Sequence, residues 1–130
     1  MIETFLSNFN LNVTKKEVET FKLYLDILQE WNSKINITSI KSYDDIIIKH
    51  LIDSLAVIKY IDINGKIVDV GSGGGFPGIP LKIMIPSLQV TLIEAKRKKA
   101  NFLRFAIRES GYLQSSSCIC ETGAPLIISL

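Results

Sequence analysis

Residues 67–80, with the sequence IVDVGSGGGFPGIP, constrain the fold of this chain more than any other stretch. A short apolar run ends at Val70 and leads into four glycines in five positions, followed by a turn that contains two prolines. Glycine is required where the backbone takes a positive φ, or where it passes so close to a ligand that a Cβ would collide. The order predicts a strand, a ligand-binding loop and the start of a helix, rather than a bare structural turn.

The spacing of the glycines separates two kinds of nucleotide-binding loop. Gly73 and Gly78 have the separation of a P-loop, but Ile79 and Pro80 stand where that loop requires Lys and Ser or Thr. The same run fits G-x-G-x-x-G after a strand, and Glu94 follows at about the distance expected of a carboxylate that binds ribose hydroxyls. A ligand that contains a nucleoside is therefore favoured.

Asp69 bears on the charge of that ligand. It lies two positions before the first glycine of the loop, at the end of the expected strand. A carboxylate there disfavours the pyrophosphate that such a loop cradles in dinucleotide-binding proteins, and it suits a cationic ligand better. A nicotinamide or flavin oxidoreductase that uses the same loop is thus the less favoured class of enzyme.

Periodicity and capping residues mark the other elements of the chain. A short helix is expected within residues 1–10, and Thr14 with Glu17 forms a capping box before a helix over 15–32. The further elements expected are a helix over 46–60 with a start at Ser42, a strand over 67–70, a helix over 77–85, a strand over 88–93, a helix over 96–110 that Gly111 ends, and at most one short strand near residue 130. Strands that alternate with helices and are continuously apolar predict an α/β fold with a parallel, helix-covered sheet.

One face of the helix over 46–60 carries polar side chains. His50, Asp53 and Ser54 are spaced i, i+3 and i+4, so all three project from the same side. A polar helix face with a local His and Asp pair is one interpretation. A functional site is the other, and spacing alone leaves both open.

Charge is unevenly distributed along the chain. Residues 1–65 carry seven basic and nine acidic side chains, whereas residues 66–114 carry eight basic and three acidic ones. The basic side chains that follow the glycine loop can meet a polyanion or form a solvated helix start. Those considered for phosphate contact are Lys96, Arg97, Lys98, Lys99, Arg104 and Arg108.

Other features of the sequence bound the class of protein. Its length suits one domain, and no apolar run reaches the roughly 18 residues of a membrane span. The N-terminus lacks the order of a signal peptide, so a cytoplasmic protein is expected. Cys118 and Cys120, with one distant His, form neither a convincing disulfide nor a metal site, and no metal is expected.

Four segments, matched in order over roughly residues 20 to 113, resemble one protein family. They are WNSKINIT, KHLIDSL, VDVGSGGGFPGIPL and LIEAKRKKANFL. The chain resembles the RsmG (GidB) family of bacterial small-subunit rRNA methyltransferases. This resemblance implies a Rossmann-like fold, S-adenosylmethionine as the methyl donor, and N7 of one guanine in the 16S rRNA of the small ribosomal subunit as the acceptor.

The resemblance also implies roles for individual residues. Those expected along the donor are Asp69, Gly71, Ser72, Gly73, Gly75, Phe76 and Glu94, with Glu94 on the ribose hydroxyls. His50, Asp53 and Ser54 are expected to line the site near the donor as its catalytic residues, which replaces the interpretation as a polar helix face. A guanine ring nitrogen carries its own lone pair, so methyl transfer to it needs alignment rather than a general base.

The tail of the chain departs from the family pattern. We expect an N-terminal helical segment (1–62), the first half of a methyltransferase domain (63–114) and a divergent tail (115–130), all in one domain, with later strands of the family's sheet missing through truncation or a frameshift. The strand over 67–70 should then have an open edge. Either residues 125–130 fold back to cover it, or chains self-associate through it. We expect this chain to be weakly active or inactive as an enzyme, and the alternative is a non-catalytic remnant that binds RNA or another chain through its basic half and open sheet edge.

Overall fold

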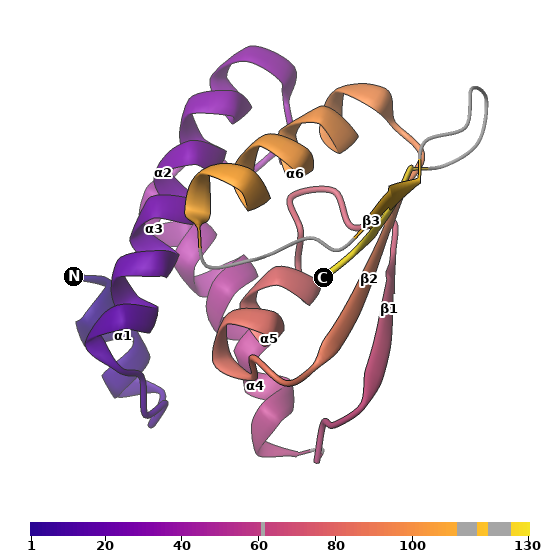
Figure 1. Cartoon of the computed structure of the whole chain (residues 1–130). Helices are drawn as coiled ribbons and strands as arrows, with labels where there is room; N and C mark the ends of the chain where they lie inside the picture. Colours follow the sequence, from indigo (N-terminus) through magenta and orange to yellow (C-terminus); the bar gives the residue numbers. More distant parts are fainter. Residues whose placement is uncertain (61, 112–116, 120–125) are drawn as a thin grey trace.

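The computed structural model describes residues 1–60, 62–111, 117–119 and 126–130. Its elements are α1 (Ile2–Asn8), α2 (Lys15–Ile35), α3 (Tyr43–Ile46), the π-helical segment η1 (Ile47–Ile52), α4 (Asp53–Ala56), the 3₁₀ turn η2 (Val57–Lys59), β1 (Lys66–Val70), α5 (Gly78–Met84), β2 (Gln89–Glu94), α6 (Arg97–Ser110), β3 (Ser117–Ile119) and β4 (Leu126–Ser129). The helices lie together on one side of the sheet (Figure 1). The α/β, Rossmann-like fold expected from the sequence is confirmed.

Helix α2 forms the centre of the helical layer. The capping box at its start is present, because Thr14 Oγ1 accepts from the Glu17 amide and the Glu17 carboxylate accepts from the Thr14 amide. Its buried face includes Phe21 and Tyr24, and it packs against α5 and α6. Rings from three elements meet there, with Tyr24 5.8 Å from Phe76 and 6.2 Å from Phe102 between centroids. The core therefore joins the N-terminal helices to the glycine loop.

The helix α2 continues three residues past the expected end. Its C-cap is Asn36, which takes the left-handed conformation at φ 51°. Buried Asn32, placed in a turn by the sequence, is helical, and its side chain organises the next loop instead. Its Oδ1 accepts from the Thr38 amide at 2.9 Å and its Nδ2 donates to the Ile40 carbonyl at 3.1 Å. The polar composition thus did predict side-chain to backbone bonds, but the helix end was placed too early.

The expected helix over 46–60 is a succession of helical types rather than one regular α-helix. Ser42 caps it as predicted, with Oγ accepting from the Asp45 amide at 3.4 Å. The π-helical segment η1 then precedes α4 and η2. A π segment adds a residue to the turn and changes the direction of the side chains that follow. Such segments occur frequently at functional sites.

The elements that follow agree closely with the sequence. Strand β1, helix α5, strand β2 and helix α6 each begin or end within about one residue of expectation. Gly111 ends α6 in the left-handed conformation at φ 60°. No helix in the described part of the chain is long and apolar enough to cross a membrane.

The sheet has the strand order β1-β2-β4-β3 and is mixed rather than parallel throughout. Strands β1 and β2 are parallel, whereas β4 pairs antiparallel with both β2 and β3. The tail thus forms two short strands where one was expected. Of the two alternatives given for the open edge of β1, coverage by the tail does not hold for residues 126–130, because β4 pairs with the far edge of β2.

In the described part of the chain, the helices lie on one face of the sheet (Figure 1). On the covered face Asp69 of β1 and Leu92 of β2 are buried, whereas Val68 and Val70 point to the other face and are 59% and 76% exposed. The expectation of a sheet covered by helices therefore holds for one face only (Figure 1). Among the described strands, β1 is an edge, so the open edge predicted for it is present.

Candidate functional site

The glycine loop between β1 and α5 is left-handed at three positions. Gly71, Gly73 and Gly75 have φ of 73°, 55° and 86°. A side chain is strained in this region of φ by roughly 1 to 2 kcal/mol, which explains the choice of glycine. The three glycines differ in the space around them. A Cβ at Gly73 would meet only the Gly71 carbonyl oxygen, at 3.9 Å. The space beside Gly73 is therefore open to a ligand.

Glu94, at the end of β2, holds this loop in place. Its Oε2 accepts a hydrogen bond from the Gly73 amide at 2.7 Å, and its Oε1 accepts from the Lys96 amide at 3.0 Å. The carboxylate is buried, yet each carboxylate oxygen has a second lone pair. Glu94 can thus support the loop and still accept hydroxyl groups of a bound molecule.

Asp69 is buried beneath the loop and ties it to α5. Its Oδ2 accepts from the Gly78 amide at 3.1 Å, while Ser72 donates its hydroxyl to the Asp69 carbonyl at 2.9 Å. Burial raises the pKa of the Asp69 carboxyl above its usual value, although the Gly78 amide opposes this. Asp69 and Ser72, which are among the residues expected along the donor, therefore also stabilise the loop itself.

Tyr24 supports the loop from the side of the core. A Cβ at Gly75 would collide with the Tyr24 hydroxyl and would lie 2.6 Å from Cδ1 of Ile79. Burial raises the pKa of Tyr24 well above its usual value, and the charge of Asp69 adds to this. Among the residues that the structure describes, the Tyr24 hydroxyl is the buried side-chain group without a hydrogen-bond partner. Gly75 is consequently needed for packing as well as for φ.

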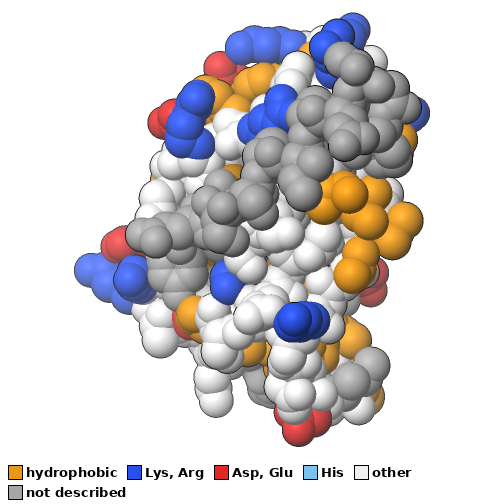
Figure 2. Space-filling view, turned by 45° about the vertical axis from the view of Figure 1, so that its right-hand side comes forward, with side chains coloured by type: hydrophobic (Ala, Val, Ile, Leu, Met, Phe, Trp, Pro, Cys, Tyr) orange, Lys and Arg blue, Asp and Glu red, His pale blue; other side chains and the backbone are white. Residues whose placement is uncertain are grey.

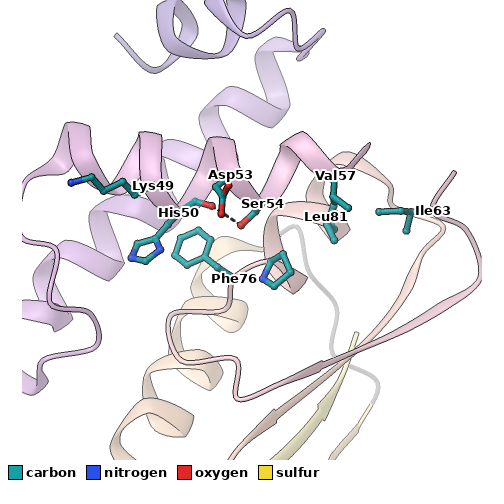
Figure 3. A pocket seen from close by; sticks show the side chains of 9 residues that line it. Lys49, His50, Asp53, Ser54, Val57, Ile63, Phe76 and Leu81 are labelled. Carbon is teal, nitrogen blue, oxygen red and sulfur yellow. Dashed lines mark hydrogen bonds between the residues drawn. The ribbon is translucent and has the colours of Figure 1, made fainter. Parts of the chain in front are cut away.

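A cavity of about 400 Å³ opens next to the loop, between the helical segment 47–59 and the start of α5. Figure 3 shows His50, Asp53, Ser54 and Val57 on the helical segment, facing Phe76 and Leu81. The three polar residues expected on one helix face thus do border one cavity. Its lining comprises Lys49, His50, Asp53, Ser54, Val57, Ile63, Phe76, Pro77 and Leu81.

His50 is held by contacts on two sides. Its Nε2 lies 2.9 Å from Thr38 Oγ1, and its ring stacks on Phe76 with 5.0 Å between centroids and 14° between planes. Burial lowers the pKa of His50 below its usual value, with a smaller opposing effect of Asp53. The imidazole is therefore neutral at pH 7. Phe76 follows Gly75 directly, so the stack joins the cavity to the glycine loop.

Basic side chains follow the loop at the start of α6 and along that helix. Lys96, Arg97 and Lys98 are exposed, and Arg108 lies 5.6 Å from the centroid of the Phe105 ring. Lys99 and Arg104 are half-buried. Figure 2 shows Lys and Arg side chains at the upper end of the molecule in that view, and others lower on the same face. The arrangement offers a basic surface close to the end of β2.

The structure brings the expected site residues together as two neighbouring groups. Glu94 and the glycines form one, and the residues around His50 form the other. Sequence reasoning missed Thr38, which contacts His50, and Tyr24, which packs against the glycine loop. Thr38 belongs to the segment WNSKINIT, whose polar pattern was a signal, whereas Tyr24 lies in an ordinary apolar period of α2. Within the described ranges, His, Cys, Asp and Glu form no cluster suited to a metal.

Comparison with known proteins relates these residues to a family. The sequence profile of GidB, described as rRNA small subunit methyltransferase G, matches residues 17–121. That match runs past residue 115, where the family pattern was expected to end.

Curated relatives show the same similarity. A ribosomal RNA small subunit methyltransferase G of Caldanaerobacter subterraneus subsp. tengcongensis is 46% identical over 101 residues, covering 76% of this chain and 42% of the relative. The protein of the same description from Syntrophus aciditrophicus is 44% identical over 123 residues, covering 93% of this chain and 51% of the relative. The chain thus spans about half the length of these relatives.

Two glycine substitutions should separate backbone strain from contact with the core. Gly71→Ala adds a Cβ with no atom within 4 Å and should lower the free energy of unfolding by about 1 to 2 kcal/mol, from φ alone. Gly75→Ala adds the collision with Tyr24 and Ile79 and should lose about 1 to 3 kcal/mol more, as overpacking does. Urea denaturation measures both.

A second change tests the source of the difference. Adding Tyr24→Phe to Gly75→Ala removes the colliding hydroxyl and should restore part of the loss, whereas Tyr24→Phe alone should change stability little. Equal losses at Gly71 and Gly75 would contradict the contact between the loop and the core.

Proposed function

Since the chain belongs to the GidB family of rRNA small subunit methyltransferase G proteins, we propose that it uses S-adenosylmethionine to methylate N7 of a guanine in 16S rRNA. The observation that carries the proposal is the hydrogen bond from the Gly73 amide to Glu94. It places a carboxylate at the end of one strand beside an open glycine loop at the end of the next. This is the arrangement that binds a nucleoside at the carboxyl ends of parallel strands.

The residues present fit such a donor. Open space beside Gly73 admits a ligand where a Cβ would stand, and Glu94 keeps lone pairs for the two ribose hydroxyls. Hydrogen bonds to an ionised carboxylate are roughly twice as strong as neutral ones. When bound, the donor would supply an electrophilic methyl group on a sulfonium. Asp69 places negative charge below the loop, which would favour that cation.

The chain's own residues would act by position and by exclusion of water. Glu94 and the loop would hold the nucleoside, while His50, Asp53 and Ser54 would line the acceptor side. Guanine N7 is nucleophilic without loss of a proton, so no side chain has to act as a general base. Alignment of N7 with the methyl carbon would supply most of the rate acceleration.

The basic surface supports an RNA partner. Exposed Lys96, Arg97 and Lys98 follow the end of β2 at the start of α6, and Arg108 lies on the same helix. We propose that these side chains, with Lys99 and Arg104, contact phosphates of the small-subunit rRNA. The affinity for RNA should then fall as the salt concentration rises. Membership of the GidB family gives no support to a nicotinamide-dependent oxidoreductase. The remaining alternative is a chain that only binds RNA, and the titration described next tests it.

The donor site can be tested in the 130-residue chain by calorimetric titration with S-adenosylhomocysteine. Glu94→Ala should weaken binding by about 1.5 to 3 kcal/mol, the range for hydrogen bonds to a charged group. Gly73→Val should abolish binding, because its side chain would enter the ligand space at a left-handed position.

The matched control is Glu109→Ala, which removes an exposed carboxylate that pairs only with Arg108 in the described part of the chain. Its affinity should equal that of the unchanged chain. Unchanged affinity in Glu94→Ala, or tighter binding of NADH than of the methyl-donor product, would overturn the assignment.

Self-association through β1 is a further part of the proposal. An edge strand with unpaired backbone groups and two exposed valines pairs readily with other chains. Sedimentation velocity over a concentration series should show association that Val70→Lys suppresses. Leu23→Lys, at another exposed apolar position, should leave it unchanged. A chain that stays monomeric at all concentrations would contradict this.

Methyl transfer by the 130-residue chain is a separate question. Because β1 has no further strand on its open edge within the described part of the chain, we expect weak donor binding with little or no turnover. Incubation with unmethylated 30S subunits and labelled S-adenosylmethionine measures transfer, with a full-length relative as reference. Label in the rRNA at the rate of that reference would refute the expectation.

A further inference from the structure

We propose that the cavity beside the glycine loop receives the acceptor guanine and that Asp53 is the residue that distinguishes guanine from adenine. The inference rests on the proposed methyl transfer to guanine N7. It goes further by assigning base recognition to one carboxylate. The evidence for this assignment is the position of the cavity, its stacking surface and the chemistry of Asp53.

The cavity adjoins the donor loop through Phe76. This residue lines the cavity, and its ring lies 3.3 Å from the position of a Cβ on Gly74. A base seated against Phe76 would therefore lie next to the loop that we assign to the donor. The volume of about 400 Å³ is within the range of pockets that bind small organic molecules.

The walls near the loop suit a planar base. His50 and Phe76 already stack on each other at 14°, so they present parallel aromatic surfaces beside the cavity. Single unstacked bases of RNA are recognised by stacking on such side chains. Because burial keeps the pKa of His50 below its usual value, the ring is uncharged at pH 7 and leaves the lone pair of N7 without a competing proton.

Asp53 supplies the group that discriminates between bases. An ionised carboxylate only accepts hydrogen bonds. Guanine presents two donors, N1–H and the N2 amino group, on its Watson–Crick edge, whereas adenine presents the N1 acceptor there. Within the described residues, no hydrogen bond or ion pair engages the Asp53 carboxylate. Lys49, one turn earlier, is 3.4 Å from Asp45 instead.

The same orientation suits the reaction. N7 lies on the opposite side of the purine from N1 and the N2 amino group. A guanine held by Asp53 on its Watson–Crick edge therefore turns N7 away from the helical segment. Ser54 does not compete for the base as a donor, because its hydroxyl is bonded to the His50 carbonyl at 2.5 Å. Asp53 is thus left as the acidic side chain of the cavity.

The test titrates guanosine, inosine and adenosine 5′-monophosphates into the 130-residue chain with S-adenosylhomocysteine present, followed by NMR shifts of the Ser54 and Phe76 amides. Inosine keeps N1–H and lacks the N2 amino group, so the expected order of affinity is guanosine, inosine, adenosine. Asp53→Asn should reduce the affinity for guanosine monophosphate about tenfold, which corresponds to about 1.4 kcal/mol, and remove the preference.

The control is Asp44→Asn, an exposed carboxylate on α3 outside the cavity, which should keep the full preference. Binding of S-adenosylhomocysteine by the same samples separates the two claims. If it binds but the three nucleotides bind equally, or if Asp53→Asn keeps the preference, this inference is wrong while the proposed function stands. If S-adenosylhomocysteine does not bind, the proposed function fails first.

Discussion

The bonds from the Gly73 and Lys96 amides to the Glu94 carboxylate are the contacts on which the site depends. One buried carboxylate at the end of β2 joins the loop after β1 to the start of α6. A left-handed loop is entropically costly to order, and glycine has the most freedom to lose. Glu94 compensates by fixing the middle of the loop. Glu94, which is expected to bind the ribose hydroxyls of the ligand, is thus also the residue that fixes the conformation of the loop.

The loop has two sides with different requirements. Toward the core, Gly75 lies against Tyr24 and Ile79, and Asp69 holds the Gly78 amide, so any added atom must displace packed side chains. Toward the outside, the space at Gly73 is open. This asymmetry makes the loop rigid on one side and available on the other, which is what a preorganised binding site requires.

The one-sided sheet has a related consequence. All the helices that border the site lie on the covered face, where α2 packs its aromatic side chains against α5 and α6. The loop and the cavity are therefore assembled within residues 24–94, independently of what lies on the other face. The other face carries the exposed side chains of Val68 and Val70.

The sequence by itself determined the order of elements, because capping residues, glycines and apolar periods act locally. It predicted the capping box at Thr14, the strand before Gly71 and the stop at Gly111, and it brought His50, Asp53 and Ser54 onto one helix face. Only the tertiary structure decided the pairing of β4 with β2, the exposure of Val68 and Val70 on β1, and the supporting roles of Tyr24 and Thr38. These depend on contacts between residues far apart in the chain, such as Tyr24 and Gly75, which no local pattern encodes.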